Sequence, residues 1–111
     1  MDADFYHLIV YTPIKSADAI RTALAGAGAG SIGHYDSCSF SMHGTGRFRP
    51  DEEADPTIGA AYHLEEVKEE RIEVVVPKAH LKEVLHAVTK AHPYEEPAIH
   101  VLPMLDYHTL L

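Results

Sequence analysis

The 111-residue sequence has one cysteine, no tryptophan and few cations, with nine Lys and Arg against 17 Asp and Glu. The single cysteine, Cys38, excludes an internal disulfide and a zinc site built from several cysteines, and it indicates a reducing compartment. The net charge of −8, without a block of Lys or Arg, argues against nucleic acid as a partner, because affinity for phosphates depends on clustered cations.

Long apolar runs are also missing, since none approaches the roughly 20 residues that cross a bilayer. The N-terminus is acidic where a signal peptide would be basic. We therefore expect one cytoplasmic domain over residues 1–111, with no membrane partner and with an apolar C-terminal tail at residues 102–111.

What the chain does contain is an internal repeat: an offset of 64 residues places Pro13 on Pro77 and aligns the apolar positions around them. Each half is predicted to form an apolar strand that ends at a proline, then a helix with apolar residues every three or four positions, then a second strand. The strands are expected at residues 6–12, 35–48, 71–76 and 98–102, the third starting as early as Tyr62, and the helices at about 16–27 and 79–91.

This order of elements predicts an α+β, ferredoxin-like fold, β-α-β-β-α-β, with a four-stranded antiparallel sheet and two helices on one face. One sheet face and the apolar tail then lack a cover, so self-association is expected to bury them. The predicted core consists of Ile9 or its neighbours, Ile20, Leu24, Phe40, Val74, Leu81, Leu85 and Val88.

Two glycine-rich stretches suggest ligand contacts. Residues 28–33 match the letters G-x-G-x-x-G, but they follow a helix and lead into a strand, the reverse of the dinucleotide-binding context, and therefore predict a turn. Gly44 and Gly46, followed by Arg47, offer backbone amides and a cation to an anion.

His34, Asp36 and Cys38 stand two residues apart, so in an extended segment their side chains share a face. Imidazole, carboxylate and thiolate are all metal ligands. The favoured alternative is that Cys38 is an inward, inert thiol beside Phe40 and Met42, because free cysteines are usually buried.

Residues 92–97 concentrate His92, Tyr94, Glu95 and Glu96 at a predicted helix-to-strand junction. Such junctions often carry binding residues. A rigid connector, fixed by its two prolines, is the alternative interpretation. The sequence contains no G-x-S-x-G, H-E-x-x-H or P-loop motif, so known catalytic signatures are absent.

Residues 25–40, 44–50, 73–77 and 92–98 together resemble the stand-alone form of the domain that is inserted in YqfO-type members of the NIF-three-like family. The resemblance implies a fold similar to the CutA and PII proteins, which are ferredoxin-like trimers, and residues 92–95 also resemble a CutA motif, although the tryptophans of CutA are missing. The resemblance also implies that, in the longer members of the family, the metal site lies in the two flanking domains. The hydrolase or cyclohydrolase label of those members is therefore not carried over to this chain.

These observations lead to one main hypothesis and two rivals. The main hypothesis is a non-enzymatic homo-oligomer, a trimer by the resemblance and a dimer as second choice, that binds a small anion, metabolite or divalent metal in clefts between subunits. Its ligand-binding residues would be His92, Tyr94, Glu95, Glu96, Gly44, Gly46 and Arg47.

The first rival is a small metal-dependent hydrolase, and the second is a protein that docks a partner. Metal ligands would be His34, Cys38, His92 and Glu95, with Glu96 in place of Glu95 as an alternative. Because their two segments follow equivalent helices at different corners of the fold, we expect them to meet across a subunit boundary.

Overall fold

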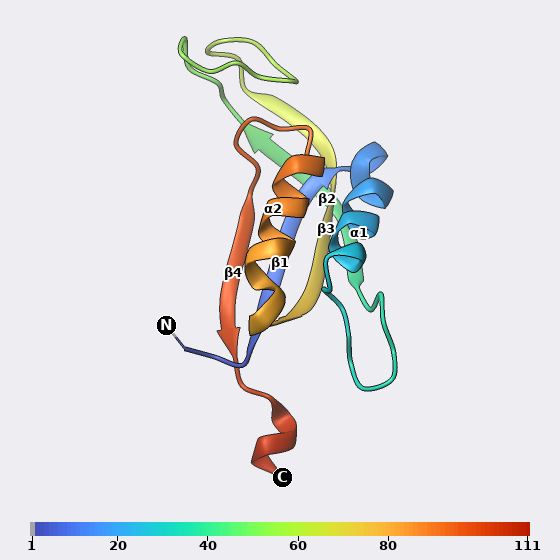
Figure 1. Cartoon of the computed structure of the whole chain (residues 1–111). Coiled ribbons are helices and arrows are strands. Elements are labelled where there is room, and N and C mark those ends of the chain that lie inside the picture. Colours follow the sequence, from blue (N-terminus) through green and yellow to red (C-terminus); the bar gives the residue numbers. More distant parts are fainter. Residues whose placement is uncertain (1) are drawn as a thin grey trace.

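Two strand-helix-strand units, joined by a long hairpin, build the chain, and the computed structural model describes residues 2–111. The sheet has the order β2-β3-β1-β4 with antiparallel neighbours, and both helices cover one of its faces (Figure 1). The predicted ferredoxin-like α+β fold is thus confirmed. The elements are β1 (Phe5–Pro13), a 3-10 turn (Ile14–Ser16), α1 (Ala17–Gly26), β2 (Phe40–Phe48), β3 (Glu65–Pro77), a 3-10 turn (Lys78–His80), α2 (Leu81–Ala91), β4 (Ile99–Met104) and a 3-10 turn (Tyr107–Leu110).

The internal repeat is visible at the strand ends. Pro13 and Pro77 are the last residues of β1 and β3, and each is followed by a 3-10 turn and a helix. Helix α2 ends at Ala91 because Pro93 pushes the preceding residue, His92, into an extended conformation with φ −74° and ψ 136°. The proline-marked boundaries read from the sequence are therefore those of the fold.

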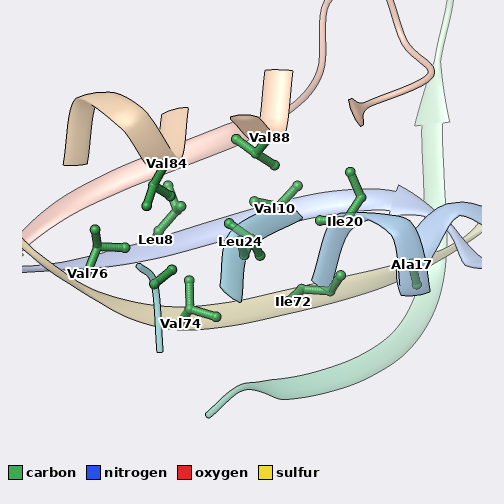
Figure 2. Packing of buried hydrophobic residues seen from close by; sticks show 11 residues of the cluster. Leu8, Val10, Ala17, Ile20, Leu24, Ile72, Val74, Val76, Val84 and Val88 are labelled. Carbon is green, nitrogen blue, oxygen red and sulfur yellow. The ribbon is translucent and has the colours of Figure 1, made fainter. Parts of the chain in front are cut away.

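The core lies between the sheet and the two helices (Figure 2). Ile20, Leu24, Val74 and Val88 are buried there as predicted, and Leu81 and Leu85 pack against it while partly buried. Each fully buried Leu or Ile side chain contributes about 1.5–3 kcal/mol by the area that it removes from water. The buried members are Leu8, Val10, Ala17, Ile20, Leu24, Ala29, Ile72, Val74, Val76, Val84 and Val88.

The prediction that Phe40 belongs to the core was wrong. Phe40 is 62% exposed. Its register partner on β3 is Glu73, which pairs with Ile9 of β1, so the three residues share one face of the sheet, and β2 is an edge strand with a neighbour on one side only. These residues lie on the face opposite the helices, which we call the open face. Ile9 is buried on that face rather than in the helix-covered core. The alternation of apolar and polar residues predicts that Phe40 and Met42 share a face of the sheet, but only the register with β3 decides which face that is.

The second strand begins at Phe40 instead of residue 35. Ser37 has a φ of 57°, which interrupts an extended chain. Gly30 ties the loop to the sheet: its N–H donates to the Val75 carbonyl at 2.8 Å, and its own carbonyl accepts from the Cys38 N–H at 2.9 Å. A Cβ at position 30 would collide with the Cys38 backbone. Cys38 therefore lies in a loop, partly exposed, and not in an alternating strand.

The other three strands also differ from their predicted bounds, and β1 extends one residue further at each end. β3 starts at Glu65, between the two starts considered, and β4 continues to Met104, so the first three residues assigned to the tail belong to the sheet. The remaining tail projects beyond the sheet (Figure 1) and exposes Leu105, Tyr107, Leu110 and Leu111. Within residues 2–111, no helix has the length and apolar character needed to cross a membrane.

Candidate functional site

A pocket of about 430 Å³ lies at the end of the sheet where β1 and β2 finish and β3 begins. We call it the hairpin-end pocket, because the β2–β3 hairpin loop and the connection at residues 92–98 form its walls. Its volume falls in the range of small-molecule sites. It is lined by Tyr11, Gly46, Arg47, Phe48, Arg49, Pro50, Ala54, Pro56, Thr57, Ile58, Glu69, Tyr94, Glu95, Glu96 and Ala98.

The pocket gathers five of the seven residues proposed from the sequence as ligand-binding: Gly46, Arg47, Tyr94, Glu95 and Glu96. They come from β2 and from the connection between α2 and β4, which are far apart along the chain. Only the tertiary fold brings these two motifs together.

His92, a sixth proposed residue, stands behind the pocket wall and is 7% exposed. Its Nδ1 accepts a hydrogen bond from the Tyr94 N–H at 3.1 Å, so the proton is on Nε2, which donates to the Tyr11 carbonyl at 2.7 Å. Both ring nitrogens are thus engaged within the chain. His92 positions the connection against β1, and neither nitrogen is left for a metal or a ligand.

Tyr94 and Glu69 form the polar floor of the pocket. The Tyr94 hydroxyl donates to Glu69 Oε2 at 3.0 Å, and Glu69 is 8% exposed. Burial and this hydrogen bond raise the pKa of Tyr94, so the phenol stays protonated. The Phe48 ring meets the Tyr94 ring edge to face at a centroid distance of 5.7 Å, which fixes the phenol's position.

Glu69 is the site residue that the sequence analysis missed. Gly46 explains how it fits, because a Cβ at position 46 would overlap the Glu69 carboxylate. The available signal was an acidic side chain on β3 facing a glycine of the neighbouring strand. Reading it requires the β2–β3 register, which pairs Gly44 with Glu69.

The hairpin loop is held over the connection by two hydrogen bonds. The Asp55 N–H donates to Glu95 Oε2 at 2.9 Å, and Thr57 Oγ1 donates to the Pro93 carbonyl at 2.5 Å. These contacts join the two walls of the pocket. They also occupy part of the Glu95 carboxylate, so Glu95 acts on the pocket's shape as well as on its charge.

The proposed anion site at Gly44, Gly46 and Arg47 has a different environment in the structure. Gly44 lies within the paired part of β2 and does not line the pocket. Gly46 lies against a carboxylate, which repels an anion, and Arg47 Nε pairs with Glu66 Oε1 at 3.1 Å. The geometry therefore gives no separate anion cradle on this strand.

The four proposed metal ligands are not brought together within one chain. His34 and Cys38 lie in the loop between α1 and β2, at the opposite end of the sheet from His92 and Glu95 (Figure 1). In the described part of the chain, no group of three or more His, Cys, Asp or Glu side chains is placed to hold a metal ion. A site shared by these residues would need a second subunit, and this stays a prediction.

A second polar cluster lies on the helix side of the sheet. Arg21 of α1 pairs with Glu70 Oε2, and His43 Nε2 lies 3.0 Å from Glu70 Oε1. Burial alone would raise the pKa of Glu70, which is 5% exposed, but the hydrogen bonds from Arg21 and His43 outweigh it and lower the pKa. This cluster ties α1 to the edge of the sheet.

The chain matches known proteins over most of its length, although no protein-family model matches it. It is 44% identical over 101 residues to the Halalkalibacterium halodurans protein named GTP cyclohydrolase 1 type 2 homolog. The match covers 91% of this chain but 27% of that protein, so the chain spans about a quarter of the length of such relatives. What their name says of activity is a statement about the longer proteins.

Solved structures show the same relationship in three dimensions. A Bacillus cereus protein related to NIF3 superposes with a TM-score of 0.81 and 39% identity over 96% of this chain and 27% of its own. This chain therefore resembles NIF3-related proteins over about a quarter of their length, and we refer to it below as a NIF3-like domain. CutA1 from Shewanella sp. SIB1 matches with a TM-score of 0.70 at 16% identity, covering 96% of the NIF3-like domain and 86% of CutA1.

A PII protein also shares this fold. Arabidopsis thaliana PII matches the NIF3-like domain with a TM-score of 0.63 at 18% identity, covering 95% of the domain and 79% of PII. At such identities the CutA1 and PII matches establish the fold alone. The predicted resemblance to a NIF3-like domain with the CutA/PII-like fold is confirmed.

Proposed function

We propose that this NIF3-like domain is a non-enzymatic, cytoplasmic binding or regulatory module that assembles as a homo-oligomer and holds a small molecule in the hairpin-end pocket. The observation that carries this proposal is the convergence of two distant motifs on one pocket of about 430 Å³. A mostly apolar lining with a few fixed polar groups is typical of small-molecule sites.

The polar groups of the pocket are arranged for binding rather than for reaction. The Tyr94 hydroxyl keeps its proton and donates a hydrogen bond to Glu69, while one Glu95 oxygen accepts a hydrogen bond from a backbone N–H. Both His92 nitrogens are engaged in hydrogen bonds with backbone groups. Acid-base catalysis needs a group that is poised to gain or lose a proton near neutral pH, and these contacts work against that.

The open face supports the homo-oligomer. Phe40, Met42 and Leu102 lie on it with exposures of 62%, 46% and 46%. A second copy that covers this face would bury them and shield the pocket, whose residues Tyr11, Gly46 and Phe48 face the same side. The number three rests on the resemblance to CutA and PII, and a divalent metal shared by His34, Cys38 and Glu95 across subunits stays part of the proposal.

An NMR titration tests the pocket. Uniformly ¹⁵N-labelled protein is titrated with a panel of small amines, carboxylates, nucleotides and divalent metal ions, and binders are expected to shift the amides of Gly46, Phe48 and Tyr94. Replacing Tyr94 with Ala should weaken binding at least about tenfold, because it opens the floor and removes a ring contact.

Tyr35 provides the matched control, since it is 76% exposed in the loop at the other end of the sheet. Tyr35→Ala should leave binding unchanged. If Tyr94→Ala binds as tightly as the wild type and assembles normally, residues 92–97 are a connector and the proposal is wrong.

A further inference from the structure

Strand β3 carries three buried or largely buried glutamates, Glu69, Glu70 and Glu73, which differ in their hydrogen-bond and ion-pair partners. Glu70 is paired with Arg21 and His43, as described above. Glu73 lies 2.8 Å from His7 Nε2 and 3.3 Å from Arg71 Nε. Glu69 has a single side-chain donor among residues 2–111, the neutral phenol of Tyr94. One of three similar carboxylates thus lacks a cation.

The neighbours of Glu69 explain the difference. Its register partners on the two flanking strands are Gly44, which has no side chain, and Pro13, which has no donor. A carboxylate can accept about four hydrogen bonds, and burying one without partners is costly. Glu69 lines the hairpin-end pocket, so the partner that the chain does not supply has a route to it from the pocket.

The rest of the lining favours the same kind of ligand. Three carboxylates line the pocket, those of Glu69, Glu95 and Glu96, against two guanidinium groups. Of these two, Arg47 pairs with Glu66 at 3.1 Å, and Arg49 lies over the Tyr62 ring at 4.9 Å. The walls between the charges are apolar and partly aromatic: Phe48, Pro50, Pro56, Ile58 and Ala98.

We propose that the hairpin-end pocket binds an organic cation with an apolar body, an amidinium, guanidinium or protonated amine, whose N–H groups donate to the Glu69 carboxylate beside the Tyr94 hydroxyl. This inference rests on the proposed function, because it names the chemical class that the same pocket takes. The cation completes the hydrogen bonding of Glu69, and the flat body lies between the aromatic and proline side chains.

Three isosteric probes test the class: benzamidine, which is cationic, benzamide, which is neutral, and benzoate, which is anionic. Their dissociation constants are measured by ¹H–¹⁵N NMR titration of the full chain at pH 7. Benzamidine should shift the amides of Gly46, Phe48 and Tyr94 and bind about tenfold or more tightly than the other two, as charge-assisted hydrogen bonds are the strong ones.

Two variants test the residue. Glu69→Gln keeps an acceptor for the Tyr94 hydroxyl but removes the charge, and should weaken benzamidine binding about tenfold or more. Glu83→Gln makes the same change on the exposed face of α2 and should have no effect. Tyr94→Phe removes the hydroxyl that competes for Glu69, so benzamidine should bind equally or a few-fold more tightly.

The outcomes separate this inference from the proposed function. If benzoate or benzamide shifts the same amides more strongly than benzamidine, the pocket binds small molecules but the class is wrong. If Glu69→Gln, with a well-dispersed spectrum, binds benzamidine like the wild type, or if Tyr94→Phe loses binding tenfold, Glu69 is not the recognition residue. If none of the three probes shifts these amides, the cation class is refuted, and the wider panel described above decides on the pocket itself.

Discussion

Replacing Tyr94 with Phe removes one oxygen from the floor of the hairpin-end pocket and leaves the ring in place. The ring keeps its edge-to-face contact with Phe48 at 5.7 Å. What is lost is the 3.0 Å hydrogen bond to Glu69, a carboxylate that is 8% exposed and has no other side-chain donor in the described part of the chain. The variant therefore isolates the energy of one hydrogen bond.

The expected cost is about 1.5–3 kcal/mol of unfolding free energy, the usual range for a hydrogen bond to a charged group. At about 4 °C per kcal/mol for a chain of this length, the Tm should fall by about 6–12 °C. The pKa of Tyr94 is raised in the folded protein, so its contribution is fully present below the pKa of an unfolded tyrosine, near 10, and is lost as the pH rises through the folded pKa. The gap between wild type and variant should therefore narrow above about pH 10.

Urea unfolding followed by circular dichroism at pH 7 and at pH 11 measures the difference in unfolding free energy between wild type and variant and its decrease at high pH. The matched control is Tyr35→Phe, at a ring that is 76% exposed, and it should change the unfolding free energy by less than about 0.5 kcal/mol. Equal free energies for the two variants at pH 7 would refute the reasoning, because Glu69 would then be hydrated and not dependent on the phenol.

Two further predictions concern the helix side and the open face. Arg21→Met should cost about 1–3 kcal/mol of unfolding free energy at pH 7. The pKa of Glu70 is lowered in the folded state, so the contribution of this pair to stability is present above the unfolded pKa, near 4.3, and is lost as the pH falls through the folded pKa. Urea unfolding should therefore show a much smaller cost at pH 3, and an equal cost there would contradict the pairing. Phe40→Ser should weaken self-association about tenfold or more in sedimentation equilibrium and should change the stability of the monomer by less than about 0.5 kcal/mol. The control, Ile32→Ser, removes a 49% exposed side chain from the α1–β2 loop and should leave self-association unchanged. Unchanged association of Phe40→Ser would mean that the open face is not the interface.

The sequence predicts several residues of the hairpin-end pocket but not how they are brought together. The motif at residues 92–97 and the Gly46-Arg47 pair were both identified, but nothing in the linear order says that they share one pocket. Glu69 was passed over because a glutamate in an acidic chain looks like a solvated charge until its neighbours, Gly44 and Pro13, are known. His92 was assigned to ligand binding, whereas its two nitrogens hold the backbone in place.

The sequence by itself determined the order of the elements and most of the core. The repeat that aligns Pro13 with Pro77, and the apolar spacing of Ile20, Leu24 and Val88, are local patterns, and local patterns follow from the fixed periods of helix and strand. The tertiary structure alone decided which face of the sheet Phe40 occupies and which groups surround Glu69. Those depend on strand register, and a shift of one residue moves every side chain to the other face without changing the alternation that the sequence displays.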